Sequence, residues 1–224
     1  MSVVARTEVT AGFLVVRHPR VDHVRVTSFD ERAAEWDTPE RRERAEAVAA
    51  AIRGNVPLTR TMRTVEIGAG TGLLGLALTG DVGELVLTDP SAGMLAAARR
   101  KLAGGPANVS AVRFELLSDT WTGGTFDLAI SLLVLHHLKD TAASLAAIHG
   151  LLNPGGILAL VDLDAEDGSF HSDMEGIHHQ GFEREAVAGK ARDAGFTDVS
   201  VTDAPDLDRD GRTYPLFLLT ARRP

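Results

Sequence analysis

The residues of this chain that are best suited to chemistry lie in one glycine-rich stretch, from Val65 to Gly75. A short apolar run with β-branched residues leads into the alternating glycines Gly68, Gly70 and Gly72, and a helical pattern begins directly after them. Glycine adopts positive φ freely, and its missing Cβ lets a ligand approach the backbone. The first N–H groups of the following helix have no internal partners and point at whatever lies over the turn. The stretch therefore predicts a strand, a tight turn and a helix that bind a nucleotide.

An acidic residue, Asp89, ends the next predicted strand about twenty residues after the turn, where a carboxylate accepts hydrogen bonds from ribose hydroxyls. The string from Gly70 to Gly75 also reads Gly-x-Gly-x-x-Gly, the dinucleotide fingerprint, which carries little information by itself. Both NAD and S-adenosylmethionine offer an adenosine ribose. These residues thus indicate an adenosine-type ligand and leave the choice between the two open.

Three further features separate the two ligands. Glu66 stands two residues before Gly68, where a carboxylate repels a pyrophosphate but helps to hold a cationic methionine end, directly or through water. A block over 126–138 that contains two adjacent histidines follows an acidic loop, and a Leu-Asn-Pro-Gly-Gly turn over 152–156 precedes another apolar run. Glu66 favours S-adenosylmethionine over NAD. The other two features are motifs at the fourth and fifth predicted strands.

The elements that must position these residues alternate regularly along the sequence. Strands are predicted around 64–67 and over 84–88, 112–117, 126–133 and 157–162, with helices over 71–78, 91–102, 141–152 and 183–194. This alternation predicts a parallel sheet covered by helices on both faces. The last two strands, 197–202 and 213–221, are joined by a loop over 203–212 that is too short for a covering helix, so we expect them to pair antiparallel.

The N-terminal part is expected to form two separate units. Residues 1–27 are interpreted as an extension whose two short apolar runs, 13–16 and 21–26, form a hairpin, pair with another subunit or lie loosely; the sequence leaves this open. A short amphipathic helix over Phe29–Trp36 and a longer helix that begins at Pro39, with Thr38 as its N-cap, predict a helical lid over about 28–55. This lid begins a single domain over 28–224.

The composition of the whole chain excludes several kinds of function. It has 224 residues, 44% of them hydrophobic, which suits one α/β domain with a buried core. Its formal net charge of −8 argues against nucleic acid or an anionic membrane as the main partner. The absence of cysteine excludes disulfides, thiolate nucleophiles and cysteine-based zinc sites. We expect a cytoplasmic protein whose partner is a small molecule, with a homodimer left open.

The chain resembles the class I S-adenosylmethionine-dependent methyltransferases from about Phe29 to the C-terminus. The resemblance rests on four features that follow one another along the chain: the segment 65–75, Asp89, and the segments 126–138 and 152–160. The resemblance implies an α/β fold of the Rossmann-like type, a three-layer sandwich. Its seven-stranded, mostly parallel sheet would have the order 3-2-1-4-5-7-6 with strand 7 antiparallel, and helices would cover both faces. This agrees with the alternation of elements and with the antiparallel pairing expected of the last two strands.

The resemblance also implies the cofactor S-adenosylmethionine, with S-adenosylhomocysteine as its product, and it assigns residues to them. The turn would line the methionine and ribose, Asp89 would bind the ribose, and Met94 would pack on the adenine. Asp119 would face the adenine amino group, although the loop reads Leu-Ser-Asp-Thr-Trp where the family often has Gly-Asp before a small residue, so the backbone near Ser118 is an alternative. The residues implied at the cofactor are Glu66, Gly68, Ala69, Gly70, Gly72, Asp89, Pro90, Met94, Ser118, Asp119, Ser131 and Leu132.

Histidines supply the candidate catalytic groups, because imidazole exchanges a proton near neutral pH. His137 follows the fourth predicted strand, and His178 and His179 lie in an irregular loop over 163–181 that faces the substrate side in this architecture. Of the adjacent His136 and His137, we expect one to pack under the sheet edge. The loop also carries His171 and several acidic residues, but their spacing matches no metal geometry, so no metal is expected.

The sequence therefore predicts methyl transfer from S-adenosylmethionine to an oxygen, nitrogen or carbon nucleophile of a small molecule, achieved mainly by in-line alignment. An NAD-dependent oxidoreductase is the first alternative, which the presence of a single tyrosine, Tyr214, disfavours. A non-catalytic scaffold that retains the fold is the second alternative.

Overall fold

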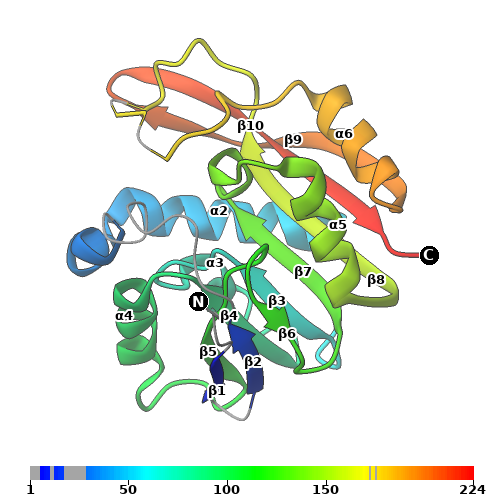
Figure 1. The fold of residues 1–224 in the computed structure, drawn as a ribbon. Coiled ribbons are helices and arrows are strands. Elements are labelled where there is room, and N and C mark those ends of the chain that lie inside the picture. Colours follow the sequence, from blue (N-terminus) through cyan, green and yellow to red (C-terminus); the bar gives the residue numbers. More distant parts are fainter. Residues whose placement is uncertain (1–5, 11–12, 18–28, 172, 175) are drawn as a thin grey trace, which may run out of the picture.

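The centre of the computed structural model is a single seven-stranded sheet (Figure 1). The structure describes residues 6–10, 13–17, 29–171, 173–174 and 176–224. The strands of this sheet are β3 (Arg63–Ile67), β4 (Glu84–Asp89), β5 (Val109–Arg113), β7 (Phe126–Leu132), β8 (Leu152–Leu163), β9 (Thr197–Arg209) and β10 (Arg212–Arg222). Their spatial order is β5-β4-β3-β7-β8-β10-β9, and β10 runs antiparallel to both of its neighbours. The predicted order and the antiparallel last strand are confirmed.

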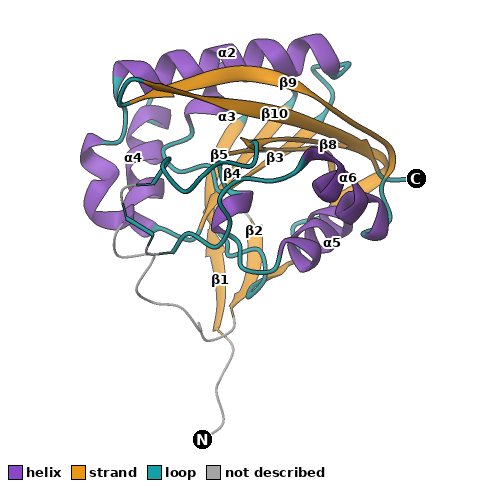
Figure 2. Ribbon diagram, turned by 90° about the horizontal axis from the view of Figure 1, so that it is seen from above, coloured by secondary structure: helices purple, strands orange, loops and turns teal. Residues whose placement is uncertain are grey.

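Helices cover both faces of the sheet, as the alternation of elements predicted (Figure 2). One face packs against α2 (Pro39–Asn55), α3 (Leu73–Ala77) and α4 (Ala92–Leu102), where side chains such as Ile52 and Leu74 are buried. The other face packs against α5 (Thr141–Leu151) and α6 (Arg184–Asp193), with Leu145 and Val187 in a second core. Strands between two cores are apolar on both sides, which explains the continuous apolar runs of the sequence.

Local sequence signals determine where two of these helices begin. The Thr38 hydroxyl accepts the backbone N–H of Arg41 at 3.3 Å, with proline at the first helical position of α2. The Ser91 hydroxyl accepts the N–H of Met94 at 3.1 Å and so caps α4. Both N-caps were predicted from residue type, because a short hydroxyl side chain satisfies a backbone donor that the helix cannot.

Three predicted boundaries were wrong. The turn expected over 152–156 is instead the first part of β8, which begins at Leu152. The third strand of the prediction, 112–117, lies three residues earlier, at Val109–Arg113, because the chain turns after Phe114 and Leu117 is exposed. The expected loop over 203–212 does not exist; β9 and β10 extend as one long hairpin around Asp210 and Gly211, which have φ of 51° and 76°. An Asp-Gly pair with positive φ at both residues is a strong hairpin turn.

Before this domain, two short strands form a small second sheet. β1 (Arg6–Thr10) pairs antiparallel with β2 (Phe13–Arg17), which in turn pairs with β6 (Thr120–Trp121). The run over 13–16 is thus a hairpin strand, but its partner precedes it; the other predicted run, 21–26, lies outside the described residues. In the part of the chain that the structure describes, no helix is long and apolar enough to span a membrane.

Candidate cofactor and acceptor site

The glycine-rich turn joins β3 to α3 with a backbone that requires glycine. Gly68, Gly70 and Gly72 have φ of 65°, 55° and 80°, a region that other residues enter only with strain. The neighbouring strand holds the turn in place, since the backbone N–H of Ala69 donates to the Thr88 carbonyl oxygen at 2.8 Å. The turn is therefore a fixed surface of exposed backbone at the carboxyl edge of the sheet, where ligands bind in open α/β folds.

Asp89, at the end of β4, connects this turn to the next helix. Its Oδ2 accepts the N–H of Gly70 at 2.8 Å, and its Oδ1 accepts the N–H of Ser91 at 2.8 Å. Each carboxylate oxygen can accept two hydrogen bonds, so these bonds to backbone N–H groups do not exclude a ribose hydroxyl as a donor. Asp89 thus shapes the turn and is compatible with its predicted role in ribose binding.

Glu66 lies below the turn and is almost fully buried. Its Oε2 accepts the N–H of Gly75, at the start of α3, at 3.0 Å. Burial raises the pKa of Glu66 to about 8, and nearby Asp89 adds to this, although the Gly75 hydrogen bond opposes it. A buried carboxyl group of this kind ionises more readily when a cation arrives, which is the property expected beside a methionine ammonium or sulfonium group.

The raised pKa of Glu66 predicts a pH-dependent stability. The group binds a proton in the folded state up to about pH 8 but in the unfolded chain only below its ordinary value of 4.5. The free energy of unfolding should therefore fall by about 1.4 kcal/mol per pH unit between these values. Urea unfolding at pH 5, 6.5 and 8 should show that this slope disappears in Glu66→Gln and persists in Glu43→Gln, whose side chain is exposed. Parallel slopes in all three proteins would contradict the assignment.

The segment before α2 covers the turn and is tied to it by side chains. The Thr71 hydroxyl and the Lys101 ammonium both donate to the Asp37 carboxylate. Trp36 lies over the turn: its Nε1 would be 3.8 Å from a Cβ placed on Gly70, and the Met94 sulfur would be 3.9 Å from it. The predicted lid residue Trp36 and the predicted adenine neighbour Met94 therefore meet at the glycine whose backbone the cofactor is expected to approach.

The remaining residues assigned to the cofactor lie at the same edge but differ in what they contact. The buried Ser131 hydroxyl donates to the Ile67 carbonyl oxygen at 3.1 Å and joins β7 to β3. The Asp119 carboxylate accepts the N–H of Glu115 at 2.9 Å, and the N–H of Ser118 donates to the Glu115 carbonyl oxygen, so both residues form a local turn. The Pro90 carbonyl oxygen accepts from a nearby arginine, and Leu132 ends β7 half-buried.

A buried pair of His136 and Asp162, which the sequence did not reveal, lies beside this edge. His136 follows the end of β7, Asp162 lies near the end of its parallel neighbour β8, and both side chains are almost fully buried. His136 Nδ1 is 2.7 Å from Asp162 Oδ1, and the same carboxylate accepts the N–H groups of His136 and Leu163. A carboxylate accepts only, so Nδ1 carries a proton. In the neutral ring, Nε2, which has no hydrogen-bond partner among the described residues, then presents the lone pair.

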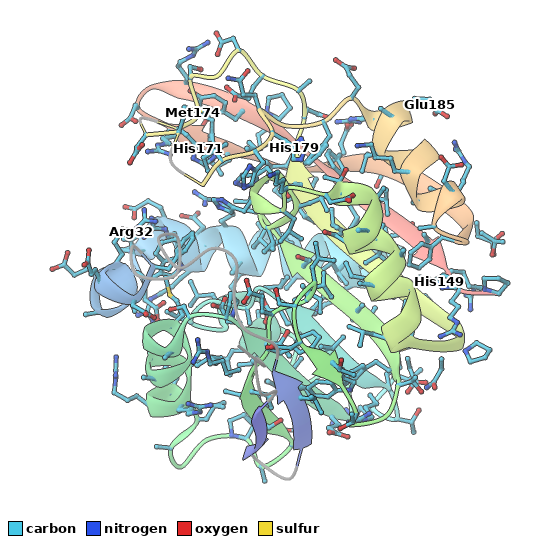
Figure 3. The ribbon with its side chains drawn as sticks, in the orientation of Figure 1. Arg32, His149, His171, Met174, His179 and Glu185 are labelled. Carbon is cyan, nitrogen blue, oxygen red and sulfur yellow. The ribbon has the colours of Figure 1, made fainter. Side chains whose placement is uncertain are left out.

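Four other histidines gather around His136. The rings of His137 and His171 lie 4.1 Å and 5.0 Å from its ring, and the N–H groups of His178 and His179 donate to its carbonyl oxygen. Figure 3 shows His171 and His179 on the loop after β8. His137 Nδ1 is 3.3 Å from the Gly176 carbonyl oxygen, and His179 Nε2 is 3.1 Å from that of Leu138. Burial lowers the pKa of His171 to about 4, and repulsion from His136 and Arg209 adds to this. The fold thus brings the three predicted catalytic histidines together around His136, which was not among them.

Comparison with known proteins agrees with this geometry. Residues 65–158 match the family model for a methyltransferase domain. An uncharacterised methyltransferase of Mycobacterium bovis is 31% identical over 106 residues, which are 47% of this chain and 52% of the relative. The chain therefore spans about half the length of such curated relatives.

Solved structures share the fold at lower sequence identity. A chain of the Haloferax volcanii complex between the Trm112 methyltransferase activator and a methyltransferase superposes with a TM-score of 0.73 at 20% identity, covering 88% of this chain and 97% of that one. The N-methyltransferase NodS from Bradyrhizobium japonicum, solved with S-adenosylhomocysteine, superposes with a TM-score of 0.67 at 18% identity. The match covers 89% of this chain and 98% of that one.

The seven-stranded fold, the glycine turn and the matched domain together define one class of protein. Residues 65–158 form a methyltransferase domain, and the sheet that contains it has the strand order of the class I S-adenosylmethionine-dependent methyltransferases. The family expected from the sequence is confirmed.

Proposed function

We propose that this protein transfers the methyl group of S-adenosylmethionine to an oxygen, nitrogen or carbon nucleophile of a small molecule. The observation that carries the proposal is the turn of three positive-φ glycines, tied to Asp89 through the Gly70 N–H and lying inside the matched methyltransferase domain. Cofactor-bound relatives of the same fold support the choice of ligand.

The residues of the turn fit such a cofactor. Gly68, Ala69, Gly70 and Gly72 would present backbone to the methionine and ribose, Asp89 would accept from the ribose, and the buried Glu66 would offset the positive charge. When bound, S-adenosylmethionine supplies a methyl group that is already activated on a sulfonium. The protein then has to bind the acceptor in line with that methyl group and exclude water, which we assign to the lid with Phe29 and Trp36.

A base is needed only when the acceptor carries a proton at the attacking atom. His137, His178 and His179 remain proposed for contact with the acceptor or for this proton transfer. The lone pair on His136 Nε2, buried and backed by Asp162 through Nδ1, makes His136 a fourth candidate, because a carboxylate partner stabilises the imidazolium that a base becomes.

Ligand titration separates the proposal from its two alternatives. We expect S-adenosylhomocysteine at 100 times its Kd to stabilise the protein by about 2.7 kcal/mol, which appears as a rise in Tm, while NAD has no effect. A rise with NAD alone would support an oxidoreductase, and no rise with either ligand would support a scaffold. Calorimetric titration of the same samples gives the Kd and checks that the shift comes from binding.

A further inference from the structure

Four arginines converge at the open side of this site, although the chain as a whole is acidic with a net charge of −8. Arg41, on α2, places its guanidinium carbon 4.1 Å from the centre of the Trp36 ring, and Arg32 of the lid lies 5.6 Å from the same ring. Arg44 follows Arg41 one helical turn later. Arg209, at the end of β9, lies 5.2 Å from the centre of the Phe170 ring. Helix α2 packs on β9, which brings Arg209 near the other three arginines.

Repulsion among these arginines exceeds the attraction of the carboxylates next to Arg41 and Arg44, while Arg209 also has an ion pair with Asp210 at 3.4 Å. Burial lowers the pKa of Arg41, and repulsion from Arg32 and Arg209 lowers it further, by more than the neighbouring carboxylates raise it. Burial likewise lowers the pKa of Arg44. Repulsion from Arg41 and Arg209 lowers it further, by more than the attraction of Glu40 raises it. Among the described residues, Arg44 has no carboxylate within ion-pair distance. Such an arrangement costs free energy unless an anion offsets the repulsion.

Aromatic rings connect the cluster to the glycine turn and to the histidines. On one side, Trp36 separates Arg41 from Gly70. On the other side, Phe170 lies 4.6 Å from the His171 ring, and Arg209 and Arg32 both act on the pKa of that histidine. Figure 3 shows Arg32 on the lid and His171 on the loop after β8, facing the same side of the molecule. The Nε2 atom of His171 is buried and has no hydrogen-bond partner among the described residues.

We propose that the methyl acceptor carries an anionic group, a carboxylate or a phosphate, which Arg41, Arg44 and Arg209 bind beside the aromatic rings of Trp36 and Phe170. Guanidinium groups match the planar oxygens of these anions with paired hydrogen bonds, and they retain their charge when desolvated. This inference rests on the proposed methyl transfer, because it assigns the cluster to the acceptor of that reaction.

Calorimetric titration of the protein saturated with S-adenosylhomocysteine tests the inference, with inorganic phosphate and benzoate as probes at constant ionic strength. The test variant is Arg44→Gln with Arg209→Gln. The matched control is Arg60→Gln with Arg100→Gln, which removes two exposed arginines and the same net charge. We expect at least one probe to bind the wild type. Its Kd should rise about tenfold in the test variant and stay unchanged in the control variant. Binding of phosphate alone or of benzoate alone identifies which anion the acceptor carries.

Four results would overturn the inference. Neither probe binds the wild type, or both bind the test variant as well as the wild type. Alternatively, the test variant loses affinity for S-adenosylhomocysteine itself, which would assign the arginines to the methionine carboxylate of the cofactor. Because relief of repulsion should leave the Tm of the test variant equal or higher at low salt, a lower Tm would also contradict it. If S-adenosylhomocysteine does not bind the wild type, the proposed function fails first, and titration without it still tests anion binding.

Discussion

Gly70→Ala is expected to keep the fold and weaken the binding of S-adenosylhomocysteine by roughly ten- to a hundredfold. A Cβ at this position would meet only Trp36 Nε1 at 3.8 Å and the Met94 sulfur at 3.9 Å, which are ordinary contacts. The loss of stability should therefore be limited to the strain of φ at 55°, about 1–2 kcal/mol. The same methyl group would occupy the surface that the cofactor is proposed to approach. Calorimetric titration and urea unfolding measure the two effects separately.

Two other glycines serve as controls for this experiment. In Gly72→Ala a Cβ would lie 2.6 Å from the Leu87 Cδ1 atom at a φ of 80°, so stability should fall more than in Gly70→Ala. Gly80→Ala places its Cβ in open space and should change neither stability nor binding. If Gly70→Ala binds S-adenosylhomocysteine as tightly as the wild type, the cofactor does not lie against this part of the turn.

Asp162→Ala is expected to produce the largest loss of stability, about 3–5 kcal/mol. The buried carboxylate accepts from His136 Nδ1 and from the backbone N–H groups of His136 and Leu163, and alanine leaves all three donors without a partner. A buried donor that loses its acceptor costs more than the hydrogen bond contributed, because water cannot replace the acceptor. Urea unfolding at neutral pH measures the change, and nitrogen chemical shifts of labelled histidine report the His136 tautomer.

An exposed carboxylate on the following loop provides the matched control. Asp167 lies 3.0 Å from Arg212, but both side chains are exposed, so Asp167→Ala should leave the unfolding free energy almost unchanged. The unfolding free energy of Asp162→Asn should lie between those of Asp162→Ala and Asp167→Ala, since its single carbonyl oxygen can accept only part of the lost hydrogen bonds. Equal stability of Asp162→Ala and Asp167→Ala would show that the carboxylate of the His136 pair is not needed by the fold.

Much of the fold follows from local patterns that the sequence contains. Apolar runs between turn signals predict the parallel strands, Thr38 and Ser91 predict two helix starts, and the short final connection predicts the antiparallel β10. The prediction failed where the signal was ambiguous: the apolar pair Leu116-Leu117 extended a strand into a turn. It also failed at Asp210-Gly211, where an Asp-Gly pair with positive φ forms a hairpin turn inside the segment that was expected to be a loop.

By itself the sequence determined the glycine turn, because positive φ and close backbone approach depend on residue type alone, and it determined Asp89 at the next strand end. Only the tertiary structure decided what surrounds them. His136 forms a hydrogen bond with Asp162 because β7 and β8 are parallel neighbours that end at one edge. Arg44 is close enough to Arg209 to be repelled by it because α2 packs on β9. Such pairs depend on burial and on contacts between distant segments, and no local spacing encodes them.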